Sequence, residues 1–136
     1  MTMYPNVSAM WLAGIVRSAL VGCKLKLYKA PCQHLGSDTV IGSFTECDYS
    51  GYTEKVIASF LPVYLDPKGG AAIQSGTQQF QYVPPKANPI GNTVMGYYLI
   101  TASGVLVFAG SFDSPTAMVS EGDAIPVNVI LNYGKN

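Results

Sequence analysis

The sequence predicts a mainly β fold, an antiparallel β-sandwich of jelly-roll-like type with one short N-terminal helix. Short runs rich in β-branched and aromatic residues alternate with turns that contain glycine or proline, a pattern typical of sandwiches and barrels. In the clearest example, TVMGYYLIT and VLVFAGSF flank the turn ASG at 102–104, as in a β-hairpin. The 136 residues fit one domain, 1–136.

The helix is predicted over residues 8–22. Ser8 can cap its first turn, and Gly22 can end it. The apolar residues fall mostly at spacings of three and four and would form one stripe: Met10, Trp11, Ile15, Val16, Ala19 and Leu20. Two roles stay open for residues 1–22, a helix packed on its own sheet or a docking arm for a neighbouring subunit.

The first strand is predicted at residues 23–29, which alternate in polarity. Leu25 and Leu27 would face one side. Lys24 and Lys26 would lie on a solvated face, where lysines also protect an edge strand from unwanted pairing. A lysine cluster this small does not indicate a nucleic-acid site, which needs clustered basic residues.

Turn-forming residues divide the middle of the chain. Residues 30–38 are predicted as a loop, 39–45 as a strand or a connector, and 47–51 as a turn. Residues 52–65 are expected to break at Pro62 or to form an edge strand, because proline cannot donate to a ladder.

The next strand is predicted within residues 71–83, ending in strict alternation, with Gln78, Phe80 and Tyr82 facing one side and Gln79, Gln81 and Val83 the other. Residues 84–89 (PPKANP) would form a loop with polyproline character. After the hairpin, residues 113–123 are expected to connect to a last strand at 124–133. Pro126 places that strand at an edge or a bulge.

Charge favours a surface covered by protein partners. Charged residues make up 12% of the chain, and eight basic residues balance eight acidic ones. An ordinary domain has about 25% charged residues, and a neutral surface repels its own copies weakly. We therefore expect a subunit rather than a neutral monomer. No membrane segment or export leader is predicted, because Arg17 and Pro89 interrupt the two apolar stretches.

No catalytic or metal site is predicted. The trio Cys32, His34 and Asp38 lies within one loop, where nucleophile, base and orienting group would not converge. A zinc site from Cys23, Cys32, His34 and Cys47 matches no common module. The acidic pairs Glu46 with Asp48 and Glu121 with Asp123 lie in turns, where carboxylates serve backbone hydrogen bonding. The sequence predicts no enzyme and no cofactor.

Aromatic residues are the candidates for an interaction surface. The chain has nine tyrosines, and a strand would direct Tyr97 and Tyr98 to opposite faces, one to the core and one to an interface. The predicted interface residues are Tyr4 and Trp11 in the N-terminal segment with Tyr97 and Tyr98 on the sheet. Exposed aromatics could also stack on sugar rings, which leaves a carbohydrate-binding module as an alternative.

Three segments carry a family resemblance, FTECDYSGY at 44–52, GYYLITASGVLVFAGSFDSP at 96–115 and SEGDAIPVNVIL at 120–131. In layout the chain resembles small virion structural proteins of tailed bacteriophages. The resemblance implies a capsid decoration (cement) protein, as a homo-oligomer with a trimer expected. Its partners would be the major capsid protein or other virion proteins, and its location the virion after synthesis in the host cytoplasm. A tail, neck or fibre-base component is the alternative position. The resemblance accounts for neither residues 84–89 nor the three cysteines.

Overall fold

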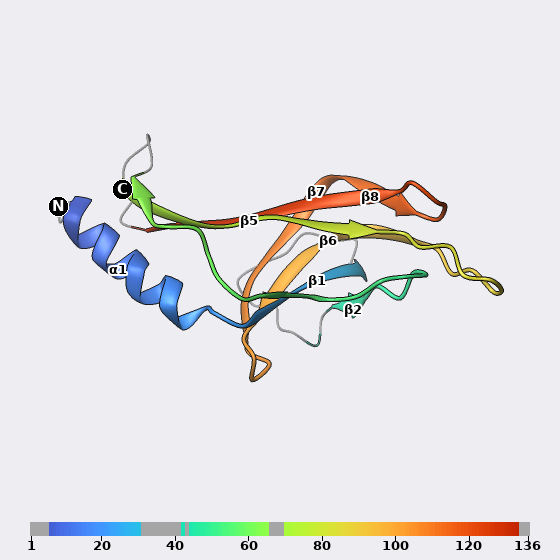
Figure 1. Ribbon diagram of the computed structural model, residues 1–136, viewed down its shortest axis with the longest axis horizontal. Helices are drawn as coiled ribbons and strands as arrows, with labels where there is room; N and C mark the ends of the chain where they lie inside the picture. The colour runs from blue at the N-terminus through green and yellow to red at the C-terminus, as the bar shows by residue number, and fades with distance from the viewer. Residues whose placement is uncertain (1–5, 31–41, 43, 66–69, 134–136) are drawn as a thin grey trace. The chain divides into compact units, whose positions relative to one another are not determined.

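The computed structural model describes residues 6–30, 42, 44–65 and 70–133. They form two antiparallel β-sheets in a sandwich-like arrangement and one short N-terminal helix (Figure 1). This confirms the mainly β prediction. No helix among the described residues is long and apolar enough to cross a membrane.

The larger sheet has five strands, in the order β2-β1-β6-β7 with β3 also paired to β1. These strands are β1 (Cys23–Ala30), β2 (Thr45–Glu46), β3 (Lys55–Ile57), β6 (Asn92–Ile100) and β7 (Leu106–Met118). Strand β1 therefore has paired neighbours on both sides. The expectation that its lysines protect a sheet edge is wrong, because two short strands from the following segment cover that edge.

Both faces of this sheet carry buried side chains. On one face Leu25 and Leu27 are fully buried and lie opposite Leu99 and Tyr97 of β6. On the other face Tyr28, Tyr98 and Ile100 form a buried cluster. Phe44 packs against this cluster, with its ring stacked on that of Tyr98 at a centroid distance of 4.6 Å.

The predicted hairpin is confirmed, with strands β6 and β7 joined at Thr101–Val105. The Thr101 N–H donates to the Val105 carbonyl at 2.8 Å, and Gly104 adopts φ 95°, which favours glycine. The sequence predicts a connection over residues 113–123. Strand β7 runs on to Met118, so only residues 119–123 connect it to β8. The register shows why: Gly96 pairs with Ser111 and Val94 with Thr116, so residues 112–115 bulge opposite the single residue Met95.

The smaller sheet has the order β4-β5-β8, from β4 (Tyr64–Leu65), β5 (Ala71–Gln81) and β8 (Ala124–Tyr133). The alternation predicted around Phe80 is confirmed, because Phe80 and Tyr82 are buried while Gln79, Gln81 and Val83 are exposed. The predicted break at Pro62 is also confirmed, since Pro62 lies between β3 and β4 in neither strand. Strand β8, which contains Pro126, is an edge of the sheet, as predicted.

Helix α1 spans Asn6–Ala19 rather than residues 8–22. Ser8 lies inside the helix, so the prediction that it caps the helix is wrong, because the backbone is already helical from Asn6. Gly22 does follow the helix as predicted. Its φ of 87° suits glycine, and its N–H donates to the Ile57 carbonyl at 2.8 Å.

The apolar residues of α1 lie on two opposite sides rather than on one stripe. Ala13 is buried against Ala71 and Val63. Arg17, on the same side, donates from Nη2 to the Phe60 carbonyl at 2.8 Å and from Nε to the Leu61 carbonyl at 2.9 Å.

The opposite side of α1 consists of Trp11, 67% exposed, and Ile15, 50% exposed; we call it the helix face. The prediction of one stripe that holds both Trp11 and Leu20 is therefore wrong, because Leu20 is buried while Trp11 is exposed. Residues 11 and 15 are separated by about 40° around a helix, and both lie roughly opposite Ala13 and Leu20.

The described residues group into two compact units. One holds α1, β4, β5 up to Gln78 and β8 from Val127. The other holds residues 23–56 and 79–126, and so contains β1, β2, β6, β7 and the first residues of β8. The expectation of one domain over 1–136 stays a prediction.

Candidate interaction surface

The residues considered for catalysis or zinc are not brought together in the described structure. Cys32, His34 and Asp38 lie outside the described residues. Cys23 and Cys47 are buried free thiols. Burial raises the pKa of Cys47 to about 12 and also raises that of Cys23, so both thiols are neutral near pH 7 and weakly nucleophilic. Within the described residues, no group of three or more His, Cys, Asp or Glu side chains could hold a metal ion.

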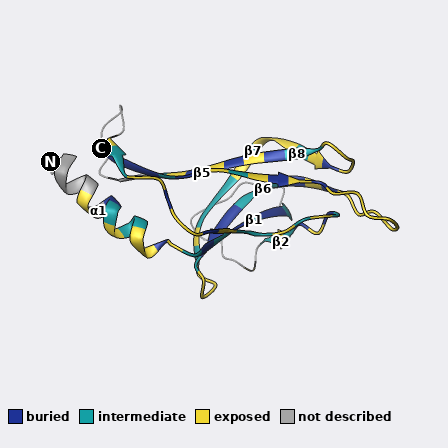
Figure 2. Cartoon of the chain, in the orientation of Figure 1, coloured by how far each residue is buried: buried dark blue, intermediate teal, exposed yellow. Residues whose placement is uncertain are grey.

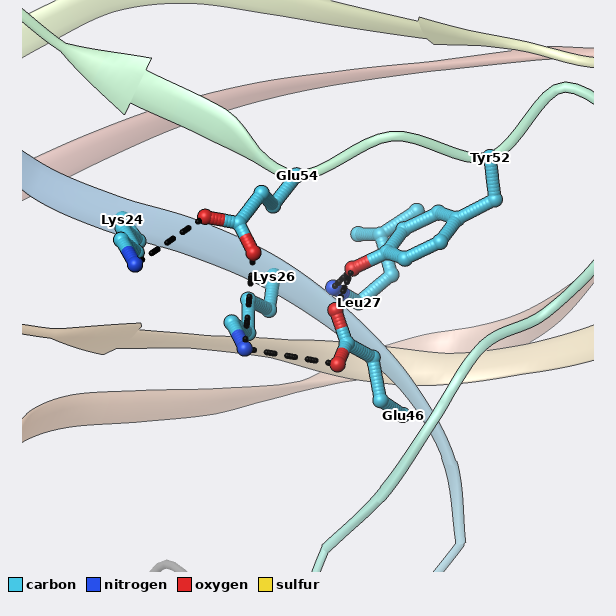
Figure 3. Close-up of polar contacts among 6 residues, drawn as sticks. All are labelled: Lys24, Lys26, Leu27, Glu46, Tyr52 and Glu54. Atoms are coloured by element: carbon cyan, nitrogen blue, oxygen red, sulfur yellow. Dashed lines mark hydrogen bonds and ion pairs between the residues drawn. The ribbon is translucent and has the colours of Figure 1, made fainter. Parts of the chain in front are cut away.

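The lysines of β1 are held by carboxylates rather than freely solvated (Figure 3). Lys26 Nζ lies 3.4 Å from Glu46 Oε1 and 3.6 Å from Glu54 Oε1, and its side chain is only 18% exposed. Lys24 Nζ lies 3.6 Å from Glu54 Oε2. The expectation of a solvated face is therefore wrong for Lys26, whereas the side chain of Lys24 stays 39% exposed. The segment that contains Glu54 runs back across this face of the strand.

Tyr52 completes this network and joins it to the second sheet. Its hydroxyl donates to Glu46 Oε2 at 2.7 Å and accepts from the Leu27 N–H at 3.2 Å (Figure 3). Its ring stacks on Phe80 of β5 at 6.3 Å. Burial, reinforced by the hydrogen bond to Glu46, raises the pKa of Tyr52. The network has a structural role, because every charged group in it has a partner.

The other acidic candidates also serve structure. The hydrogen bonds from Lys29 Nζ, at 2.8 Å, and from Asn92 Nδ2, at 2.9 Å, lower the pKa of Asp48. Asp123 Oδ2 accepts the N–H groups of Val119 and Ser120, each at 3.0 Å, and these bonds lower the pKa of Asp123. The predicted turn at 120–123 is thus confirmed, with its carboxylate engaged.

The two adjacent tyrosines of β6 lie on opposite faces, as predicted. Tyr98 is 5% exposed within the cluster of Tyr28 and Phe44, and burial raises its pKa to about 12. Tyr97 is half-buried on the other face. Of the predicted interface residues, Tyr4 lies outside the described residues, Trp11 lies on the helix face, and only Tyr97 of the pair reaches the surface.

Tyr97 is the centre of a partly exposed aromatic row. Its ring centroid lies 6.0 Å from that of Phe108 and 6.0 Å from that of Phe112, both on β7. Gly110 lies directly opposite Tyr97, and a Cβ there would be 2.9 Å from ring carbons of Tyr97. The alternation of Phe108, Gly110 and Phe112 is the sequence signal that could have predicted this row.

A shallow cavity of about 280 Å³ continues from this row, between the β7 bulge and the start of β8. We call it the β7 groove. Its lining includes Phe112, Asp113, Ser114, Thr116, Ile125 and Pro126. Phe112, Ile125 and Pro126 make it largely apolar, and the exposed Asp113 gives it one acidic group. Sequence reasoning missed this groove, because it depends on a bulge that no local pattern predicts.

The proline loop, residues 84–89, is a second surface feature of the same unit. It forms no strand, as predicted, and all six residues are exposed; Figure 2 shows it in yellow beyond the end of β5. Ser50 holds its base. The Ser50 carbonyl accepts the Val83 N–H at 3.0 Å, the Ser50 N–H donates to the Ile90 carbonyl at 2.8 Å, and Ser50 Oγ accepts the Ile90 N–H at 2.8 Å.

A larger cavity of about 390 Å³ lies where β5 leads into the proline loop, bordered by residues 81–84 and 121–124. One carboxylate of its lining, that of Asp123, already accepts two backbone N–H groups. Glu121 is exposed at its rim. Few polar side chains of this cavity are therefore free to bind a ligand.

Comparison with known proteins identifies no relative: no protein-family model, no curated protein and no solved structure matches the chain. Function must therefore be argued from the surface itself. The candidate features are the helix face in one unit and, in the other unit, the aromatic row, the β7 groove and the proline loop.

Proposed function

We propose that this chain is a structural protein of a tailed-bacteriophage particle, most specifically a capsid decoration protein that binds across seams between shell subunits. The observation that carries the proposal is the helix face. Trp11 and Ile15 are at least half exposed on an ordered helix whose other side is anchored through Ala13 and Arg17. Exposed tryptophan on a firmly held element is costly in water and is enriched among residues that dominate protein interfaces.

The proposed action is mechanical. A decoration protein stabilises a shell because separating the shell subunits exposes the area it buries, and specific interfaces bury roughly 1,200–2,000 Å². Repeated copies add avidity. A neutral chain with 12% charged residues loses little charge hydration when it is covered by protein. The resemblance of residues 44–52, 96–115 and 120–131 to virion proteins supports the same proposal.

Electron microscopy with a gold-labelled antibody against this chain tests the proposal on particles of the phage that encodes it. Label distributed over the capsid is expected. Label confined to the tail, neck or fibre base would move the protein to that position in the virion. Particles without label, from a lysate that contains the protein, would contradict a virion role.

A carbohydrate-binding module is the second candidate, favoured by the row of Tyr97, Phe108 and Phe112, because aromatic rings stack on sugar rings. A glycan array with the purified chain tests it. Saturable binding to one class of glycan that a Tyr97→Ala variant loses would support this function, and an empty array would remove it.

A further inference from the structure

We infer that the chain assembles head to tail, with the proline loop of one copy docked in the β7 groove of the next. This assembly deepens the proposed function. The expectation that it closes as a trimer rests on that proposed function. Loop and groove are different surfaces of one unit, and neither takes part in the acidic, lysine or thiol clusters already explained.

The proline loop is built as a ligand. Pro84 and Pro85 fix their own φ angles and favour an extended polyproline conformation. The bonds to Ser50 hold both ends of the loop, and its residues are exposed throughout. A segment that is already extended and held at its base loses little conformational freedom on binding, which favours association.

The β7 groove has the chemistry that recognises such a segment. Proline-rich extended segments dock in grooves lined by aromatic side chains, where the flat proline rings pack on them. Phe112 borders the groove, and Tyr97 extends the aromatic surface from it. Pro126 and Ile125 add apolar walls on the β8 side. The bulge over residues 112–115 is what opens this space beside β8.

Charge complementarity selects a second copy of this chain as the occupant. Lys86 is the one charged residue of the loop, and Asp113 is the one charged residue among those that line the groove. Neither joins an ion pair with another described residue, whereas Lys24, Lys26 and Lys29 all do. With the prolines on the aromatic wall, Lys86 of one copy meets Asp113 of the next. Such peripheral pairs mainly set specificity.

The contact determines the symmetry of the assembly. Because loop and groove are different surfaces, the interface is heterologous, and repeated copies form a ring when the rotation closes. Each chain then contributes one loop and one groove. In a closed ring every chain makes two contacts, so small individual interfaces combine into a stable oligomer.

Sedimentation velocity on the full chain over a range of concentrations tests the inference. We expect a closed trimer for the unsubstituted protein. Lys86→Glu and Asp113→Lys should each raise the dissociation constant at least about tenfold, because like charges then face each other. The double variant K86E/D113K should restore assembly. Glu121→Lys, the same charge reversal at an exposed acid outside the groove, is the control and should leave assembly unchanged.

A cross-link provides a second readout without any substitution. A zero-length carbodiimide joins an amine to a carboxylate only when the two are in contact. In a mixture of isotopically heavy and light chains, we expect a cross-link from Lys86 to Asp113 that joins a heavy chain to a light chain.

Three results would overturn the inference: a monomer at every concentration, an oligomer that both single reversals leave intact, or a Lys86–Asp113 link found only within single chains. Failure here is distinguishable from failure of the proposed function. Antibody label on capsids together with a monomer in solution removes the loop-in-groove contact and keeps the decoration role. A trimer in solution together with particles that carry no label keeps the loop-in-groove contact and removes the decoration role.

Discussion

At the scale of single residues, close contacts explain why particular side chains occupy their positions. Gly110 is a clear case. The ring of Tyr97 lies against the backbone of β7 at this residue, so any side chain there would occupy the space of the ring. The aromatic row therefore depends on the absence of a Cβ on the neighbouring strand.

Gly110→Ala should destabilise the protein, by about 1–3 kcal/mol, because the added Cβ forces Tyr97 out of its place between two phenylalanines. Urea unfolding measures the change. Gly14→Ala is the matched control, since a Cβ at Gly14 meets nothing within 4 Å and alanine favours a helix. That control should stabilise by roughly 0.5–1 kcal/mol. An equal effect of both substitutions would show that the Tyr97 ring does not lie against Gly110.

Trp11→Glu should leave the stability nearly unchanged, because Trp11 is 67% exposed and its helix is anchored on the other side. Binding to shells purified without the protein should weaken at least about tenfold, the loss typical of a central interface residue. Cosedimentation measures binding, and Val21→Glu, an exposed apolar position outside the helix, is the control. Unchanged binding would remove the helix face from the interface.

At the scale of elements, hydrogen bonds over long sequence separations hold the segment after β2 against β1. Tyr52 is central, because one hydroxyl serves both the backbone of Leu27 and the carboxylate of Glu46. The neighbouring Tyr49 differs: its hydroxyl is buried without a hydrogen-bond partner among the described residues. Two nearby tyrosines thus offer a direct comparison.

Tyr52→Phe should cost about 1–3 kcal/mol of unfolding free energy, because Glu46 Oε2 and the Leu27 N–H each lose a hydrogen bond while Lys26 remains paired with Glu46 Oε1. Tyr49→Phe should be neutral or slightly stabilising, since it removes a buried polar atom that no described group satisfies. Thermal or urea unfolding of both variants measures the difference. A larger loss for Tyr49→Phe would contradict these hydrogen bonds.

At the scale of the whole molecule, burial of several tyrosines couples folding to alkaline pH. The pKa values of Tyr28, Tyr49, Tyr52, Tyr97 and Tyr98 are all raised above the ordinary 10.0, with burial as the largest cause in each case. Above pH 10 the unfolded chain therefore binds fewer protons than the folded one. Folding stability must fall as pH rises through this range.

We expect the unfolding free energy to be insensitive to these groups below about pH 9 and to fall steeply above about pH 10. Each contributing tyrosine adds up to about 1.4 kcal/mol per pH unit between its unfolded and folded pKa values. Tyr98→Phe should reduce the slope between pH 10 and about 12, where its own pKa lies. Urea unfolding at several pH values measures this. An unchanged slope in the variant would contradict the burial of Tyr98.

Periodicity and turn chemistry predicted most of the fold. The alternation around Phe80, the hairpin at Gly104 and the stop at Pro62 are local, because each depends on the preferences of a few adjacent residues. The sides of α1 were predicted less well. Apolar spacing cannot show which of two apolar sides meets the sheet, and here Ala13 is buried while the larger Trp11 is exposed.

The sequence by itself determined a mainly β chain with one N-terminal helix, the main strands, the hairpin and the exposed proline loop. Only the tertiary structure decided that β1 is interior, that Lys26 is paired with Glu46 and Glu54, and that a groove lies beside the β7 bulge. The physical reason is the sequence separation over which each interaction acts. Backbone preferences act between neighbours in the chain, whereas strand order, ion pairs and grooves depend on segments that meet only when the chain has folded.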